Sequence, residues 1–391
     1  MSDSSLCNIL VVDDEPDLEE LMRQRMRREI RRGSYRLEFA SNGLQALEAL
    51  QKNPEIEIVL SDINMPVMDG LTLLDKIPLI NDQIKAVMIS AYGDMKNIRS
   101  AMNRGAFDFI TKPVDFEDLK ITISRTTEAV RASRQHVENR EKLLSIQSEL
   151  ATAAKMQKSI LQTTFPSSDS FDVYASMEAA REVGGDFYDV RIVRPPPSDF
   201  LGVCIADVSG KGVPAALFMM ASWTLLRGAT IGHRDPSKVV EEVNNMLEQQ
   251  NDSMMFVTLF YGLYNPDDRE FRYVNAGHNN PVLFRADGSV EELDTTMGIA
   301  LGIMRETPFA ENSVTLNKGD MVLLYTDGVN EAETGDEELF GMDRLMNVFD
   351  GRPPPLNAKE AIDEVFRKVR GYVGNYPQSD DITCLAVCAT K

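Results

Sequence analysis

The chain has 391 residues, of which 61 are acidic and 41 basic, so its formal net charge is -20. This length favours two domains over a single core, and the acidic balance argues against nucleic acid as a partner. The most apolar run, residues 215–226, is too short to span a bilayer. We therefore expect a soluble, cytoplasmic protein that has no membrane contact.

The sulfur and imidazole side chains are too scattered to suggest a metal site. The four cysteines and three histidines are spread along the chain. Cys384 and Cys388 fall in an apolar, strand-like run, where we expect buried thiols. Any metal ion is therefore expected among carboxylates, which suit hard cations.

Short apolar runs alternate with amphipathic stretches from residue 7 to about 130, beginning with a long first helix. Five strand candidates are NILVV, LEFA, IEIVLSD, IKAVMIS and FDFITKP. The alternation predicts an α/β domain, residues 1–125, with a five-stranded, doubly wound parallel sheet. Functional residues collect at the carboxyl edge of such a sheet, where Asp13, Asp14 and Asp62 end their strands.

A helical connector follows, with bounds that we set at 126–165. Neither Pro nor Gly interrupts it, and apolar residues recur at helical spacing, with Gln157 as the one polar position in the series. The series comprises Leu143, Ile146, Leu150, Ala153 and Ile160. One long helix or two stacked helices fit this pattern, and both a coiled-coil dimer and a helix packed on its own domain remain open.

From residue 166 to 391 the pattern changes to strands. Eight strand-like segments, from DVYASM to ITCLAVCAT, are separated by turn signals, and two helices are expected at Pro214–Arg227 and Pro236–Gln250. This pattern predicts an antiparallel-rich α+β domain.

Three acids of the first domain are expected to form a cluster at one edge of the sheet. Asp13, Asp14 and Asp62 would crowd one sheet edge, which calls for a divalent cation, and Lys112 could bring an ammonium group to the same place. This arrangement suits phosphoryl transfer onto Asp62.

The segments VVDDE, SDINMPVMDG, MISAYGD and FDFITKP resemble the response-regulator receiver family. The resemblance implies that Asp62 accepts phosphate from a sensor histidine kinase and that Asp13, Asp14 and Asp62 hold Mg²⁺. It further implies a ligand from the main-chain carbonyl of Asn64. Three other positions match the switch hydroxyl, the switch aromatic and the phosphate-contacting lysine: Ser90, Phe109 and Lys112.

A second set of acids stands at strand boundaries of the C-terminal part: Asp186, Asp207, Asp327 and Asp380. Such acids can build an oxygen-rich site for two Mn²⁺ or Mg²⁺ ions. Two such ions can activate a water for in-line attack on phosphorus, which is phosphomonoester hydrolysis without a covalent intermediate.

The segments REVGGDFYDV, ADVSGKGVPAALFM, NAGHNNPVLF, YTDGVNEA and DDIT resemble the metal-dependent (PPM-type) protein phosphatases, in the bacterial branch that controls sigma factors by partner switching. The resemblance implies an antiparallel β-sandwich flanked by helices. It also implies that Asp207 bridges both ions with help from the Val208 carbonyl, that Asp327 and Asp380 bind one ion, and that Asp186 serves the other.

The stretch VGGDFYDV also resembles the GGD loop of cyclases that make cyclic dinucleotides, but Phe187 and Tyr188 stand where that loop needs an acid. We therefore interpret Asp186 as a phosphatase ligand. Arg181 is either a phosphate-binding residue or part of a surface salt bridge, and for His278 we favour a structural role.

These patterns predict a response regulator in which phosphorylation of Asp62 controls a serine/threonine protein phosphatase. The expected partners are a histidine kinase, a phosphoserine or phosphothreonine protein resembling an anti-sigma-factor antagonist, and a second copy of the chain. The alternative is a catalytically silent, phosphatase-like adaptor that binds regulatory partners. A DNA-binding regulator is disfavoured, because no helix-turn-helix pattern is found.

Overall fold

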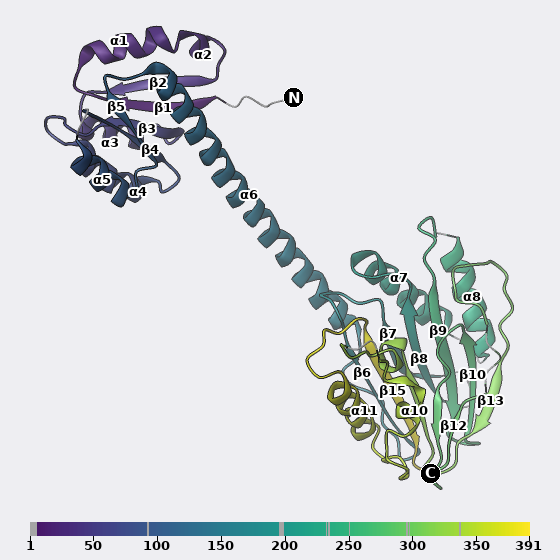
Figure 1. The fold of residues 1–391 in the computed structure, drawn as a ribbon. Helices are drawn as coiled ribbons and strands as arrows, with labels where there is room; N and C mark the ends of the chain where they lie inside the picture. Colours follow the sequence, from purple (N-terminus) through teal and green to yellow (C-terminus); the bar gives the residue numbers. More distant parts are fainter. Residues whose placement is uncertain are drawn as a thin grey trace. The chain divides into compact units, whose positions relative to one another are not determined.

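The computed structural model describes residues 6–91, 94–194, 199–231, 233, 235–249, 251–294, 296, 298–335 and 338–391. Positions 92 and 93 of the MISAYGD motif and the expected helix end at 250 lie outside this description. The chain divides into two compact units, Met1–Ile146 and Gln147–Lys391 (Figure 1). Each unit has its own sheets and core.

The N-terminal unit contains one parallel sheet, as the sequence predicts. Its strand order is β2-β1-β3-β4-β5, and every neighbouring pair is parallel. The strands are β1 (Cys7–Val12), β2 (Tyr35–Ala40), β3 (Ile56–Asp62), β4 (Lys85–Ala91) and β5 (Asp108–Lys112). Both β1 and β3 are buried along their whole length, because helices cover both faces of the sheet.

Two separate cores hold these helices to the sheet. One packs α3 (Gly43–Lys52), α4 (Gly70–Ile80) and α5 (Met95–Asn103) against one face. The other packs α1 (Pro16–Arg25) and the start of α6 (Phe116–Ile160) against the opposite face. Side-chain caps start α3 and α4: Asn42 accepts from the N–H groups of Leu44 and Gln45, and Asp69 accepts from that of Thr72.

The first helix is not the single long helix that we expected. It ends at Arg25, and a short helix α2 (Arg27–Arg31) follows after Met26. The side chain of Met26 is fully buried in the core under α1. The chain therefore turns where one apolar residue interrupts a run of exposed arginines.

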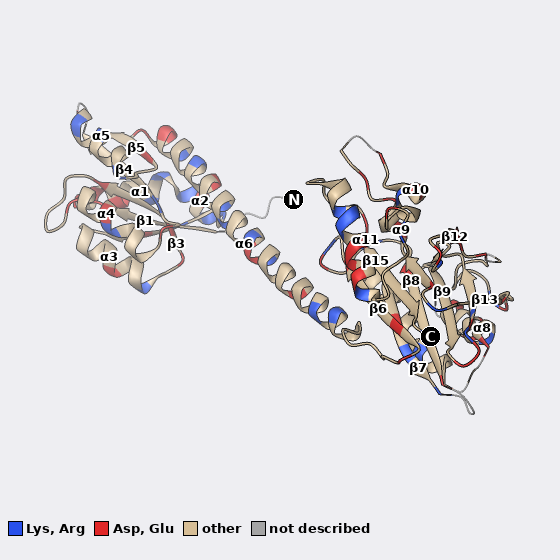
Figure 2. Ribbon diagram, turned by 90° about the horizontal axis from the view of Figure 1, so that it is seen from below, with Lys and Arg blue, Asp and Glu red and all other residues tan. Residues whose placement is uncertain are grey.

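The connector is one continuous helix, α6. Of the two alternatives, one long helix or two stacked helices, the first is therefore correct. Its first turns pack into the N-terminal core through Leu119, Ile123 and Val130. From Arg131 to Ile160 only Gln157 is buried, and both acidic and basic residues occur along the helix (Figure 2). Whether this exposed stretch forms a coiled coil stays a prediction.

The C-terminal unit is a sandwich of two antiparallel sheets, ordered β13-β10-β9-β8-β7 and β12-β11-β14-β15-β6. All the pairings are antiparallel. The strands are β6 (Phe171–Glu178), β7 (Phe187–Val193), β8 (Phe200–Val208), β9 (Val257–Asn265), β10 (Glu270–Ala276), β11 (Val282–Phe284), β12 (Val290–Glu292), β13 (Asn312–Thr315), β14 (Met321–Tyr325) and β15 (Ile382–Ala389). The inner faces of both sheets share one apolar core.

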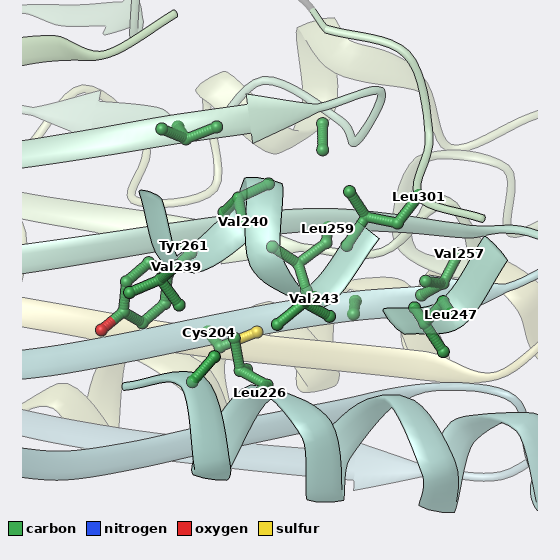
Figure 3. Packing of buried hydrophobic residues seen from close by; sticks show 14 of the residues in the cluster. Cys204, Leu226, Val239, Val240, Val243, Leu247, Val257, Leu259, Tyr261 and Leu301 are labelled. Atoms are coloured by element: carbon green, nitrogen blue, oxygen red, sulfur yellow. The ribbon is translucent and has the colours of Figure 1, made fainter. Parts of the chain in front are cut away.

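Helices cover the outer faces of the sandwich. α7 (Val213–Ala229) and α8 (Pro236–Glu248) pack on the first sheet, and Figure 3 shows this core with Leu226 from α7, Val243 from α8 and Leu259 from β9. α10 (Gly341–Met346) and α11 (Ala358–Val373) pack on the second sheet, next to the one-turn helix α9 (Asp327–Asn330). The predicted α+β class is confirmed, whereas β13 and helices α9 to α11 were not anticipated.

All four cysteines are buried and free, which confirms the expectation for Cys384 and Cys388. Within the described residues, no helix combines the length and the apolar character needed to cross a bilayer.

Candidate functional site

The carboxyl edge of the parallel sheet brings the predicted acids together. One carboxylate oxygen from each of Asp13, Asp14 and Asp62 lies within 4.8 Å of the others. The Nζ atom of Lys112, at the end of β5, lies 2.6 Å from Asp62 Oδ2 and 3.0 Å from Asp13 Oδ2. Glu15 is also within reach, 3.1 Å from the same ammonium group.

The charges at this edge depend on one another. Burial raises the pKa of Asp13, although hydrogen bonds from the Glu15 N–H and from Lys112 oppose the change. Burial alone would lower the pKa of Lys112, but hydrogen bonds to Asp62, Asp13 and Glu15 raise it. The lysine is therefore held as a cation, and the donor set of carboxylate oxygens fits a hard divalent ion.

The other predicted receiver residues lie on neighbouring strands. Ser90 is fully buried near the end of β4, directly after Ile89, which pairs with Asp62 of β3, and its Oγ has no hydrogen-bond partner among the described residues. Phe109 on β5 is half-buried against the core. The backbone N–H of Asn64 donates to Asp62 Oδ1 at 3.2 Å, and the Lys112–Pro113 bond is cis.

In the C-terminal unit, four strand ends and loops position the second set of acids. Asp186 directly precedes β7 and Asp207 lies near the end of β8. Asp327 begins α9 after β14, and Asp380 lies just before β15. Asp207 and Asp380 line the same small cavity.

The electrostatics of these acids tie them into one cluster. Burial, followed by the charge of Asp327, raises the pKa of Asp207 to about 7. Burial and then the charge of Asp207 raise the pKa of Asp186, while burial and then the charge of Asp380 raise that of Asp327. Such mutual repulsion among buried carboxylates is what bound cations would relieve, so the residues fit a metal site.

The second cluster is wider than the first. Among the described residues, only the Asp13, Asp14 and Asp62 set brings three carboxylate oxygens within 4.8 Å of one another. A site for two ions about 3.5–4 Å apart needs ligands that are spread over both ions. The wider spacing is therefore compatible with a two-ion site.

Two threonines orient Asp186. Its Oδ2 accepts hydrogen bonds from Thr383 Oγ1 at 2.5 Å and from Thr326 Oγ1 at 2.7 Å. The N–H of Thr383 in turn donates to Thr326 Oγ1 at 3.0 Å. These contacts tie the loop before β7 to β15 and to the end of β14, and no sequence motif points to them.

Asp381, the neighbour of Asp380, organises the loop around Asp186. Its Oδ2 accepts the N–H of Gly185 at 2.7 Å and that of Asp186 at 3.4 Å, and its Oδ1 accepts the N–H of Ala180 at 2.9 Å. A carboxylate used in this way is oriented toward the protein backbone. Asp380, whose carboxylate does not hold this loop, therefore stays the candidate ligand of the two.

The glycines of the motifs allow this close packing. A Cβ on Gly184 would collide with the Asp381 carboxylate, and one on Gly328 would collide with the Asp381 carbonyl. A Cβ on Gly185 would lie 3.0 Å from the carbonyl oxygen of Val208, the predicted backbone ligand. The GGD segment (184–186) and the TDG segment (326–328) therefore pack so closely against the DDIT segment (380–383) that a side chain at Gly184 or Gly328 would not fit.

Lys211 is a residue that the sequence analysis did not assign to the site. Its Nζ lies 2.8 Å from Asp380 Oδ2 and 2.8 Å from the Ser379 carbonyl oxygen. The flanking residues Gly210 and Gly212 both have positive φ angles, which suit a tight turn before α7. Only the nearness of a cation to Asp207 in the sequence could have suggested this contact.

Arg181 and His278 occupy different environments. Arg181 is exposed and lines the same small cavity as Asp207 and Lys211. His278 is buried, with Nδ1 2.9 Å from Thr258 Oγ1 and Nε2 3.1 Å from the Tyr325 carbonyl oxygen. Burial lowers the pKa of His278 to about 4, so it is a neutral residue that joins β9 to β14.

Comparison with known proteins matches the two units of the chain to two different families. Residues 9–124 match the response regulator receiver domain family, and residues 197–390 match the family described as Stage II sporulation protein E (SpoIIE). The phosphoserine phosphatase RsbU of Bacillus subtilis is 35% identical over 190 residues, which are 48% of this chain and 55% of RsbU. The sporulation initiation phosphotransferase F of the same organism is 30% identical over 117 residues, which are 30% of this chain and 90% of that protein.

A solved structure supports the fold of the C-terminal unit. The SiaA-PP2C domain of Pseudomonas aeruginosa superimposes with a TM-score of 0.53 at 25% identity, covering 63% of this chain and 98% of that one. The chain spans about half the length of the curated relatives that it matches over the longest stretches, 41% in one case and 55% in the other.

The fold and the two matched families define a chain in which a receiver domain precedes a SpoIIE/PP2C-type domain. The chain belongs to the response-regulator receiver family, here joined to a domain that matches the SpoIIE family and is similar to the phosphoserine phosphatase RsbU and to the SiaA-PP2C domain.

Proposed function

We propose that this protein is a two-component response regulator in which phosphorylation of Asp62 controls a Mn²⁺- or Mg²⁺-dependent serine/threonine protein phosphatase. The proposed domain bounds are 1–125, 126–165 and 166–391. The observation that carries the proposal is the pair of carboxylate clusters on one chain. One cluster surrounds Asp62 and Lys112, and the other surrounds Asp207.

In the receiver, Asp62 would attack a phosphohistidine of a sensor kinase. The bond between phosphorus and the histidine nitrogen breaks as the bond to the Asp62 carboxylate oxygen forms. Lys112, now 2.6 Å from Asp62 Oδ2, is placed to contact the new phosphoryl oxygens. Asp13 and Asp14, with the carbonyl of Asn64, would hold the accompanying Mg²⁺.

In the phosphatase, a water would attack the phosphorus of a phosphoserine or phosphothreonine, and the bond to the side-chain oxygen would break. Two divalent ions supply the charge that lowers the pKa of the water and neutralises the phosphate oxygens. Asp207 with the Val208 carbonyl, Asp327, Asp380 and Asp186 would hold these ions. Thr326 and Thr383 orient Asp186 for this role.

The two sites would communicate through α6. Phosphorylation is proposed to draw Ser90 toward the phosphoryl group and to reorient Phe109, which changes the face next to α6 and the pairing of its exposed stretch. We expect activation, in a cytoplasmic homodimer. The similarity to RsbU supports a phosphoserine protein as substrate, and we propose an anti-sigma-factor antagonist.

The test is the Mn²⁺-dependent hydrolysis of a generic phosphoester by the full chain, with and without beryllofluoride as a phosphoryl mimic. We expect activity that requires Mn²⁺, that Asp207→Ala abolishes, and that beryllofluoride increases in the parent but not in Asp62→Ala. Response to the mimic in Asp62→Ala would refute control through Asp62. A folded protein that hydrolyses neither the generic ester nor phosphoserine peptides would favour the adaptor alternative.

A further inference from the structure

The side chain of Gln157 is an exception on α6. From Arg131 to Ile160 it is the one buried residue, with 5% of its surface exposed. A polar side chain in the single buried position of an otherwise exposed stretch is not explained by apolar packing, because its amide must find hydrogen-bond partners.

Both ends of the Gln157 amide bind the same glycine. Nε2 donates to the Gly184 carbonyl oxygen at 2.6 Å, and Oε1 accepts the Gly184 N–H at 3.1 Å. Gly184 offers one donor and one acceptor, so this pairing determines the orientation of the amide. Gly184 is itself buried, which leaves its backbone groups dependent on Gln157.

The clamped glycine lies two residues before Asp186. Asp381 holds the same loop by accepting the N–H groups of Gly185 and Asp186. The loop is therefore fixed from α6 by Gln157 and from the residue before β15 by Asp381. A second glutamine, Gln162, lies five residues after Gln157, just beyond the end of α6. Its side chain accepts the Val190 N–H at 2.9 Å, so it ties the segment after α6 to β7.

We propose that Gln157 is a positioning residue, whose two hydrogen bonds to Gly184 set the placement of Asp186 in the metal site. This inference rests on the proposed function of Asp186 as a metal ligand. A shift or rotation of the last turns of α6 breaks both hydrogen bonds at once. The contact thus converts movement of the connector into a change in metal affinity, without any contact between α6 and the ion.

The test uses the full chain with two matched substitutions on the same helix. Gln157→Met keeps the length of the side chain and removes both hydrogen bonds, and Gln147→Met makes the same change at an exposed position. Mn²⁺ affinity is measured by titration calorimetry, and amide hydrogen exchange of the 183–187 segment is followed in metal-free protein. Any ion held by the receiver contributes equally in all variants.

We expect Gln157→Met to weaken Mn²⁺ binding about 10-fold or more, as loss of an outer-shell contact does in other metal sites. Exchange in segment 183–187 should become faster, whereas Gln147→Met should match the parent in both respects. Activity of Gln157→Met should recover at saturating Mn²⁺. Gln157→Glu keeps the acceptor but sets a carboxylate against the Gly184 carbonyl, so it should also weaken binding, which covers the case in which the Met variant fails to fold.

Two results would overturn the inference. One is a folded Gln157→Met or Gln157→Glu protein with the Mn²⁺ affinity and exchange of the parent, and the other is an equal change in Gln147→Met. An Asp186→Asn variant separates this failure from failure of the proposed function. If Asp186→Asn binds Mn²⁺ like the parent, the metal role of Asp186 is refuted; if only Asp186→Asn loses affinity, the role of Gln157 alone is refuted.

Discussion

The orientation of the Asp186 carboxylate is set by residues that are distant from it in the sequence. Its carboxylate is buried among other acids, and two threonine hydroxyl groups, from Thr326 and Thr383, hold one of its oxygens. Hydrogen bonds of this kind orient a ligand and keep it available for a cation. The acids could be predicted from their motifs, but these partners could not, because they come from residues about 140 and 197 positions away.

We predict that Thr383→Val weakens Mn²⁺ binding about 10-fold, since valine has nearly the same shape but cannot donate to Asp186. Titration of the full chain with Mn²⁺ measures the effect. Thr224→Val, on the exposed side of α7, serves as the control. Equal affinities in the Thr383→Val protein and the parent would show that Asp186 needs no orientation from β15.

The low pKa of His278 leads to a prediction about how the stability of the protein depends on pH. Its pKa falls from the ordinary 6.5 to about 4 in the folded protein, so between these values the unfolded chain binds a proton that the folded chain does not. Stability is therefore retained above pH 6.5 and lost as the pH falls toward 4, by at most about 3 kcal/mol. Urea unfolding at pH 7 and pH 4.5 should show a smaller loss in His278→Asn than in the parent, and equal losses would contradict the assignment.

At the scale of elements, strong patterns were predictable and short or long-range features were not. The five parallel strands follow from their apolar runs, and the predicted five-stranded parallel sheet was confirmed. β13 is only four residues long, with two exposed positions, so alternation could not identify it. α11 carried signals that were overlooked, an Asn357 cap and a regular apolar face. The partner of Gln157 lies outside its own helix, and no periodicity could reveal it.

The exposed stretch of α6 leads to a prediction about assembly. Leu143 and Ile146 are each more than half exposed, which is costly for apolar side chains on an isolated helix and typical of a helix that pairs with another. Ile146→Glu should shift the protein from dimer to monomer in sedimentation equilibrium. Gln147→Glu adds the same charge one position away and should leave the dimer intact; a monomeric parent protein would contradict the prediction.

At the scale of the whole molecule, two units with separate cores should respond separately to their ligands. We predict two transitions in calorimetry of the full chain, because the two units bury different cores. Beryllofluoride with Mg²⁺ should raise the midpoint of one transition only, and Asp62→Asn should remove that increase. Asp207→Ala should instead remove a Mn²⁺-dependent increase in the other transition. A single transition that moves as a whole would contradict independent domains.

The pairing of β15 with β6 has a consequence for how the protein is made. β6 is the first strand of the C-terminal unit and β15 is the last, yet they lie side by side along eight paired residues. Thr383 on β15 and Asp381 just before it also complete the surroundings of Asp186. During synthesis, the receiver can fold while the ribosome is still translating the phosphatase. The proposed metal site cannot form until residues 381–389 have emerged, so a nascent chain would complete its receiver before it completes the site that the receiver is proposed to control.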